Sequence, residues 1–170
     1  MPSYHSGNQK HQNTQLYRDT VTQQAWQHYI DKNKQQNNED LFILRDGKTY
    51  AGTHLILDFW DCQHLDNIAS IEKALRDAIK SSGATLLHIH LHHFTPNGGV
   101  SGVAVLAESH ISIHTWPERA YAALDIFMCG DTQPEKAVDV LKQAFKPTHT
   151  DIKHHLRGLT QTTEDIEQQP

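Results

Sequence analysis

The side chains with the most chemical potential gather in one stretch of this chain, residues 94–130. Its candidate reactive residues are Ser101, Glu108, Ser109, His114 and Cys129. A serine hydroxyl is a weak nucleophile unless a neighbouring group takes its proton or the peptide is strained. Two flanking strands would hold Glu108 and Ser109 in a tight turn, so Ser109 is the candidate nucleophile. A thiol such as that of Cys129 can donate a proton near neutral pH.

Alternating histidines just before this stretch raise the question of a metal site. His88, His90 and His92 would lie on one face of a strand, because side chains alternate along a strand. Their spacing of ~6–7 Å is too wide for one tetrahedral zinc ion, and zinc sites usually draw ligands at shorter loop or helix spacings. With no cluster of cysteines or carboxylates beside them, we expect structural or solvated histidines and no metal.

Strands and helices alternate along the part of the chain that must position these residues. Strands are expected at residues 54–60, 85–94, 100–106, 111–115, 121–128 and 149–156. Apolar residues recur at helical spacing in residues 65–82 and 134–145. Most neighbouring strands can pair antiparallel. The sequence therefore predicts an α+β sandwich in which two helices cover a mainly antiparallel sheet.

Three regions are expected from the distribution of polar residues. Residues 1–45 form a polar N-terminal extension, partly disordered or helical, in which Leu16–Ile30 has the pattern of an amphipathic helix with Trp26, Tyr29 and Ile30 on its apolar face. The apolar run at 41–44, followed by Asp46-Gly47, indicates a hairpin. Residues 46–157 form the folded domain, and residues 158–170 a flexible tail.

Bulk composition excludes several classes of protein. A formal net charge of -5 argues against a nucleic-acid binder, which usually has a basic face. No apolar run approaches the ~20 residues that span a bilayer, and the N-terminus lacks the apolar core of a secretory signal. We therefore expect a cytoplasmic protein without a membrane partner. Cys62 and Cys129 are too few for a disulfide framework and are expected as free thiols.

The order of motifs resembles that of the bacterial and archaeal S-adenosylmethionine decarboxylase family. The similar pieces are GVSG at 99–102, ESHISIHTWPE at 108–118, YAALDIF at 121–127 and CG at 129–130. The similarity extends over roughly residues 51–157, and the long motif around Ser109 is highly specific. The resemblance implies the family's α/β sandwich fold and a self-cleaving proenzyme. Its activity would be decarboxylation of S-adenosylmethionine for polyamine (spermidine) biosynthesis.

The resemblance also implies a cofactor made from the chain itself. In that family the serine after the glutamate attacks the preceding carbonyl, an ester forms, and elimination splits the chain and leaves a pyruvoyl group. This group forms a Schiff base with the substrate amine. By position the serine is Ser109 and the cleavage site is Glu108–Ser109. The matching residues assign proton transfer during processing to His114, stabilisation of the processing intermediate to Ser101, and protonation of the decarboxylated substrate to Cys129.

Two further residues match the family's substrate-binding positions. Glu118 would accept hydrogen bonds from the ribose hydroxyls of S-adenosylmethionine, and Phe94 would stack near its adenine and sulfonium. A solvated glutamate and a core phenylalanine are the alternatives. The family implies a homodimer of cleaved αβ protomers with sites near the interface.

Two other functions stay open at this point. Relatives that decarboxylate arginine or ornithine can share the cleavage motif, and the loop at Pro96–Gly99 has one more glycine than the family's usual turn. A non-catalytic homologue that regulates a paired decarboxylase is the second alternative.

Overall fold

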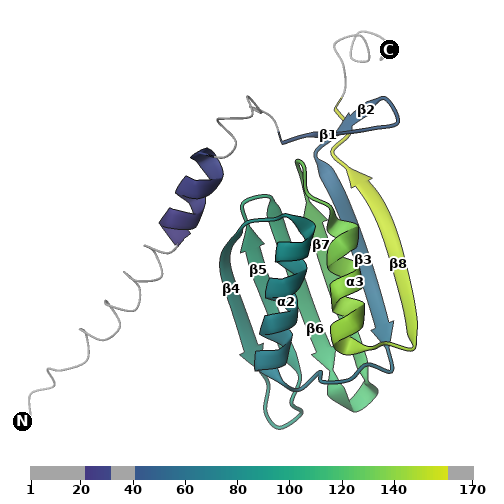
Figure 1. The fold of residues 1–170 in the computed structure, drawn as a ribbon. Helices are drawn as coiled ribbons and strands as arrows, with labels where there is room; N and C mark the ends of the chain where they lie inside the picture. Colours follow the sequence, from purple (N-terminus) through teal and green to yellow (C-terminus); the bar gives the residue numbers. More distant parts are fainter. Residues whose placement is uncertain (1–21, 32–40, 161–170) are drawn as a thin grey trace, which may run out of the picture.

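A six-stranded antiparallel sheet forms the centre of the protein. The computed structural model describes residues 22–31 and 41–160. Neighbouring strands follow the order β4-β5-β6-β7-β3-β8. Their bounds are β3 (Gly52–Trp60), β4 (Leu86–His93), β5 (Val100–Leu106), β6 (Ser109–Trp116), β7 (Tyr121–Met128) and β8 (His149–Arg157). Strands β4 to β7 are joined in sequence by hairpins, and β3 inserts between β7 and β8 (Figure 1).

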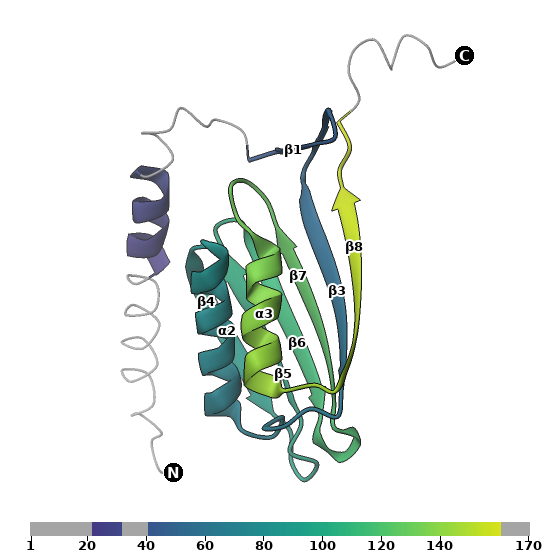
Figure 2. The same cartoon turned by 45° about the vertical axis from the view of Figure 1, so that its right-hand side comes forward.

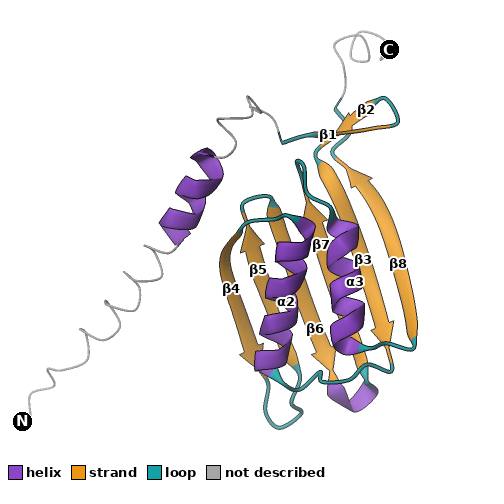
Figure 3. Cartoon of the chain, viewed as in Figure 1, coloured by secondary structure: helices purple, strands orange, loops and turns teal. Residues whose placement is uncertain are grey.

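Two helices, α2 (Ile68–Ser82) and α3 (Pro134–Phe145), lie side by side over one face of this sheet (Figures 1 and 3). Helix α2 begins where the side chain of Asn67 accepts a hydrogen bond from the Ser70 amide, and it ends at Gly83 with φ of 77°. A side-chain cap and a left-handed glycine are favoured ends for a helix because they satisfy otherwise unpaired backbone groups. Helix α3 begins at a proline, whose missing N–H costs nothing in the first turn.

The core lies between the sheet and the two helices, the two layers that Figure 2 shows from a second direction. Buried residues alternate with partly exposed ones along the central strands, as in β7, where every second residue is buried. Fully buried large side chains from the sheet and the two helices include Leu55, Phe59, Leu75, Leu124 and Phe145. The α+β sandwich expected from the sequence is confirmed.

The opposite face of the sheet has no helix over it among the described residues. Its side chains are unusually aromatic for a surface: Trp60, Trp116, Tyr121 and Phe127 all come from positions that alternate with the core. An antiparallel sheet can leave one face in water, but that face is then polar. These aromatic side chains are partly exposed, and the same face also carries the polar side chains of Asp58, Ser112 and Asp125.

The chain before β3 forms two smaller elements. Strands β1 (Ile43–Arg45) and β2 (Lys48–Tyr50) pair around the predicted turn at Asp46-Gly47. Residues 22–31 are helical and extend one residue beyond the amphipathic helix predicted at 16–30, while residues 16–21 of that prediction lie outside the described residues. No helix in the described part of the chain is long and apolar enough to cross a membrane.

Candidate active site

The Glu108–Ser109 peptide bond lies at the end of a two-residue turn. Strands β5 and β6 pair as far as Leu106 opposite Ser109, which leaves Ala107 and Glu108 as the turn. Ser109 has φ of 137°, a conformation that costs a residue with a side chain about 1–3 kcal/mol. The expected tight turn is present, and its backbone strain falls on the candidate nucleophile.

The carbonyl oxygen of Glu108 accepts two hydrogen bonds from Cys129. The backbone N–H donates over 3.1 Å and the thiol over 3.0 Å. The register of β6 and β7 places Met128 opposite Ser109, so Cys129, the next residue, reaches the turn. Two donors on one carbonyl oxygen stabilise the negative charge that nucleophilic attack would create there. The arrangement therefore favours attack on the carbonyl just before Ser109.

The side chain of Glu108 holds the turn in place. It is buried, with 6% of its surface exposed, and its carboxylate accepts a hydrogen bond of 2.8 Å from the Thr85 amide. The Thr85 carbonyl in turn accepts a hydrogen bond of 3.0 Å from the Ala107 amide. These two bonds connect the turn to the residue just before β4. Because both residues of the turn are hydrogen-bonded to Thr85, the strained backbone conformation at Ser109 can persist.

The thiol of Cys129 is in its protonated form near neutral pH. Burial, and then the negative charge of Glu108, raise the pKa of this thiol above its ordinary value. A protonated thiol can donate the hydrogen bond to the Glu108 carbonyl. It can also give a proton to a substrate carbon, which is the role predicted for Cys129.

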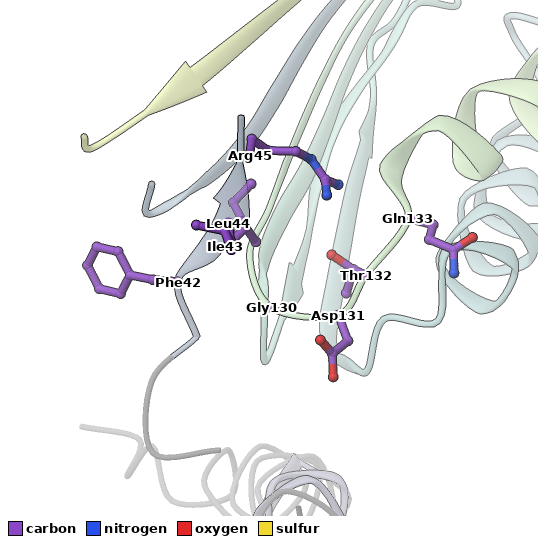
Figure 4. A pocket seen from close by; sticks show the side chains of 8 residues that line it. All are labelled: Phe42, Ile43, Leu44, Arg45, Gly130, Asp131, Thr132 and Gln133. Atoms are coloured by element: carbon purple, nitrogen blue, oxygen red, sulfur yellow. The ribbon is translucent and has the colours of Figure 1, made fainter. Parts of the chain in front are cut away.

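The loop after Cys129 is fixed from two sides. The Gly130 amide donates a hydrogen bond of 2.7 Å to the Leu41 carbonyl, and the Thr132 hydroxyl donates one of 2.9 Å to the Cys129 carbonyl. A pocket between β1 and this loop is lined by Arg45 and Asp131 among others (Figure 4). The segment before the folded domain thus helps to hold Cys129, which contacts the predicted cleavage site.

His110 is a neighbour of the nucleophile that the sequence reasoning missed. Its Nδ1 lies 3.2 Å from the Ser109 hydroxyl oxygen. Adjacent residues on a regular strand point to opposite faces, so the sequence gives no reason to pair them. The positive φ of Ser109 breaks this alternation and brings the two side chains together.

The other predicted residues form a separate group, here called the aromatic end. Ser101 and His114 lie directly opposite each other on β5 and β6. The His114 ring stacks on Trp116 at 4.0 Å between ring centroids and on Phe94 at 6.1 Å. Glu118 follows in the short helix η1 (Pro117–Arg119) and is exposed.

The turn at residues 107–109 is here called the cleavage turn, after the cleavage predicted in it, and it lies at the opposite end of the same strands from the aromatic end. His114 is five residues along β6 from Ser109, which corresponds to about 16 Å at the rise of a strand. The structure brings Glu108, Ser109 and Cys129 together, but within one chain it does not bring His114 or Ser101 to them. Phe94 and Glu118 belong to the aromatic end.

His88, His90 and His92 are exposed on β4. Within residues 22–31 and 41–160, no group of three histidine, cysteine or carboxylate side chains is placed to hold a metal ion.

Comparison with known proteins identifies the family. The profile described as S-adenosylmethionine decarboxylase matches residues 53–158. The chain belongs to the S-adenosylmethionine decarboxylase family. An S-adenosylmethionine decarboxylase proenzyme from Methanococcus aeolicus is 55% identical over 112 residues, which cover 64% of this chain and 95% of the relative. One from Thermomicrobium roseum is 45% identical over 109 residues, covering 64% of this chain and 94% of the relative.

A solved structure extends this similarity to the fold. The crystal structure of the adenosylmethionine decarboxylase from Aquifex aeolicus matches with a TM-score of 0.61 and 33% sequence identity. The match covers 66% of this chain and 94% of that one. The matched residues, 53–158, contain the six-stranded sheet from its second residue on and both covering helices, and the N-terminal region lies outside the matched profile.

The loop with the additional glycine positions Phe94. The Phe94 amide donates a hydrogen bond of 2.7 Å to the Gly99 carbonyl, and the Gly98 amide donates one of 2.8 Å to the Phe94 carbonyl. Gly98 has φ of 74°. A Cβ at Gly99 would come within 2.8 Å of the Thr115 carbonyl oxygen, so only glycine fits. Both glycines are needed to close this loop of the S-adenosylmethionine decarboxylase fold.

Tyr29 is a second residue that the sequence reasoning did not connect with the site. It is buried, with 6% of its surface exposed, and it stacks on Trp26 of the same helix. Burial, and then the charges of Glu108 and Cys129, raise the pKa of its phenol to about 12. The Thr22 hydroxyl joins the start of this helix to β4 by a hydrogen bond of 3.2 Å to the Leu87 carbonyl. The helix thus lies against the end of the sheet that contains the turn before Ser109, and the Tyr29 side chain is buried there.

Proposed function

We propose that this chain is the precursor of a pyruvoyl-dependent decarboxylase that cuts itself between Glu108 and Ser109. The mature enzyme converts S-adenosylmethionine to decarboxylated S-adenosylmethionine and CO2 for spermidine biosynthesis. Membership in the S-adenosylmethionine decarboxylase family supports this activity. The observation that carries the proposal is the strained Ser109 placed directly after a carbonyl that accepts two hydrogen bonds from Cys129.

The cleavage turn suits the formation of this cofactor. The Ser109 oxygen bonds to the Glu108 carbonyl carbon, and the carbon–nitrogen bond breaks, which turns the amide into an ester and relieves the strained linkage. Loss of the Ser109 Cα proton then expels the Glu108 carboxylate from Cβ. The dehydroalanine that remains takes up water and releases ammonia, which leaves a ketone at the new N-terminus.

In the decarboxylation reaction, the pyruvoyl group and the nearby side chains have different roles. The pyruvoyl group supplies a carbonyl that captures the substrate amine and accepts the electron pair left by CO2. Cys129, held beside the cleavage point and protonated near neutral pH, delivers a proton to the substrate α-carbon. Glu118 binds the ribose hydroxyls, and Phe94 stacks near the adenine and sulfonium, where a ring face attracts a cation.

We infer that each complete site is shared between two protomers of a homodimer. His114, with Ser101 directly opposite it, lies about 16 Å from the Ser109 of its own chain, so neither residue can act on that Ser109. Two copies that stack their aromatic sheet faces about a two-fold axis running across the strands would bring the aromatic end of one to the cleavage turn of the other. Such an interface is self-complementary, as a two-fold axis requires. It would also cover the partly exposed aromatic side chains of this face.

The location and the limits of the domain complete the proposal. A cytoplasmic protein that binds neither membrane nor nucleic acid is supported by the mild negative charge and by two free thiols in the described part of the chain. Residues 46–157 form the decarboxylase domain, preceded by the extension at 1–45 and followed by the tail at 158–170.

Release of CO2 tests the proposed activity. Purified protein is incubated separately with carboxyl-labelled S-adenosylmethionine, arginine and ornithine, with the Ser109→Ala chain as the matched control. Release from S-adenosylmethionine alone, absent in the control, supports the proposal. Release from arginine or ornithine instead would assign another substrate, and no release from any of them by cleaved protein would favour a regulatory homologue.

A further inference from the structure

The hydrogen bond between Ser109 and His110 gives the cleavage turn a proton acceptor of its own. The Ser109 hydroxyl oxygen and His110 Nδ1 are 3.2 Å apart, within the range for proton transfer. We propose that His110 is the general base that removes the Ser109 hydroxyl proton in the first step of self-cleavage. This inference rests on the proposed function, because it assigns a residue to that same self-cleavage reaction.

Packing holds the His110 ring in this position. His110 lies opposite Phe127 in the register of β6 and β7, and their rings meet edge to face at 6.0 Å. Phe127 is itself contacted by the His54 ring at 5.6 Å and covered by the Arg157 guanidinium at 5.1 Å. The Phe127 ring therefore packs against the His110 imidazole, while Nδ1 of that imidazole lies beside the Ser109 hydroxyl.

The charges around His110 favour its neutral form. Burial lowers its pKa first, and the neighbouring His54 on β3 and Arg157 on β8 lower it further, while Asp125 on β7 acts in the opposite direction. The Asp125 carboxylate is already shared, because it accepts a hydrogen bond of 3.1 Å from Ser112 and lies 3.3 Å from His54 Nε2. A neutral imidazole can accept a proton, whereas a charged one cannot.

The proposed step balances within the chain. The Ser109 proton moves to His110 Nδ1 as the serine oxygen bonds to the Glu108 carbonyl carbon. The carbonyl electron pair moves to the oxygen, which the two donors of Cys129 stabilise. His110 then returns the proton to the Ser109 nitrogen as the carbon–nitrogen bond breaks and the carbonyl re-forms. The products are an ester and a neutral amine, with His110 neutral again.

His114 has a different place in this scheme. It lies about 16 Å from the Ser109 of its own chain, so it cannot take this first proton there. The transfer assigned to His114 by family resemblance therefore belongs to a later step, in a site completed by a second protomer. His110 and His114 are predicted to block different stages when they are replaced.

The test follows the disappearance of freshly made full-length precursor over a range of pH. His110→Gln keeps a hydrogen-bond acceptor but cannot take a proton, and His110→Ala leaves space for added imidazole. His154→Gln makes the same change at an exposed histidine on β8 and is the matched control. Hydroxylamine, which cleaves esters and spares amides, reports whether an ester at Glu108–Ser109 has formed.

We expect His110→Gln to cleave about 100-fold more slowly or worse, the usual range for loss of a general base, without accumulating ester. The unaltered chain should cleave faster as pH rises through the lowered pKa of His110, and His110→Gln should lose that rise. Imidazole should restore part of the rate to His110→Ala. An unchanged rate and pH profile, or accumulated ester in His110→Gln, would overturn the inference. Failure of the unaltered chain to cleave would instead refute the proposed function.

Discussion

Ser101 and His114 face each other across β5 and β6 at the end of this strand pair that is farthest from Ser109. The same two strands carry Leu106 opposite Ser109 at their other end. In the proposed homodimer, each chain would supply two half-sites, and a face-to-face pair of chains would contain two complete sites. This relationship makes the composite site testable without any structure of the dimer.

Co-expression of two inactive chains should restore cleavage to one of them. The Ser109→Ala chain retains His114, and the His114→Ala chain retains Ser109, so a mixed dimer has one intact composite site. We expect each variant alone to stay largely uncut, and the His114→Ala chain to be cut when both are made together. Differently tagged chains on a denaturing gel give the readout. If the His114→Ala chain stays uncut in mixed dimers, the half-sites are not shared.

The backbone strain at Ser109 should be measurable as stability. Ser109→Ala and Ser109→Gly both prevent cleavage, but only glycine adopts φ of 137° without penalty. We expect the Ser109→Gly chain to unfold in urea with a free energy about 1 kcal/mol higher than that of Ser109→Ala. Equal free energies, or a less stable glycine chain, would show that the turn stores no strain at this residue.

Much of this fold could be predicted from the sequence. The strands and helices have regular apolar spacing, and signals such as Asp46-Gly47 and Gly83 mark turns and helix ends, so the sandwich follows from local patterns. Motif order also predicts the cleavage site at Glu108–Ser109, and the structure places these residues at a hairpin turn. The sequence around Ser109 predicts a hairpin connection between two strands and places the candidate nucleophile in that connection.

The arrangement of the site was harder to predict because it depends on tertiary structure. The pairing of Ser109 with His110 arises from one unusual φ angle, which breaks strand alternation. The distance between His114 and Ser109 becomes evident only when the strand register is known. Tyr29 reaches the cleavage end through docking of a helix that is far away in sequence. The signals in the sequence were the histidine next to Ser109, which could have indicated His110, and the amphipathic helix pattern, which could have indicated Tyr29.

The reactivity of Cys129 should depend on pH in a defined direction. Because its pKa is raised by burial and by Glu108, the unreactive thiol form persists to higher pH than in an unfolded chain. Stability from this thiol is thus fully present below the unfolded pKa and is lost as pH rises through the folded pKa. We expect iodoacetamide to label Cys129 of the folded Ser109→Ala chain slowly at neutral pH and faster only above the ordinary thiol range. A labelling midpoint below that of the unfolded chain would contradict this account.

Removing the Tyr29 ring should expose the cleavage end. In a Ser109→Ala background, Tyr29→Ala deletes a buried ring beside Glu108 and Cys129, so water and reagents gain access. We expect severalfold faster alkylation of Cys129, with Tyr29→Phe close to the parent chain. Gln24→Ala, an exposed position on the same helix, is the control. Equal alkylation rates in all four chains would mean that this helix does not cover the site.

Mass spectrometry of the mature protein tests the central claim most directly. The account predicts two fragments, residues 1–108 with an unmodified C-terminal Glu108 and residues 109–170 with a ketone in place of the N-terminal serine amine. Reaction with a carbonyl reagent should shift the mass of the second fragment alone. An intact chain with an ordinary Ser109, or a second fragment that begins with serine, would contradict it.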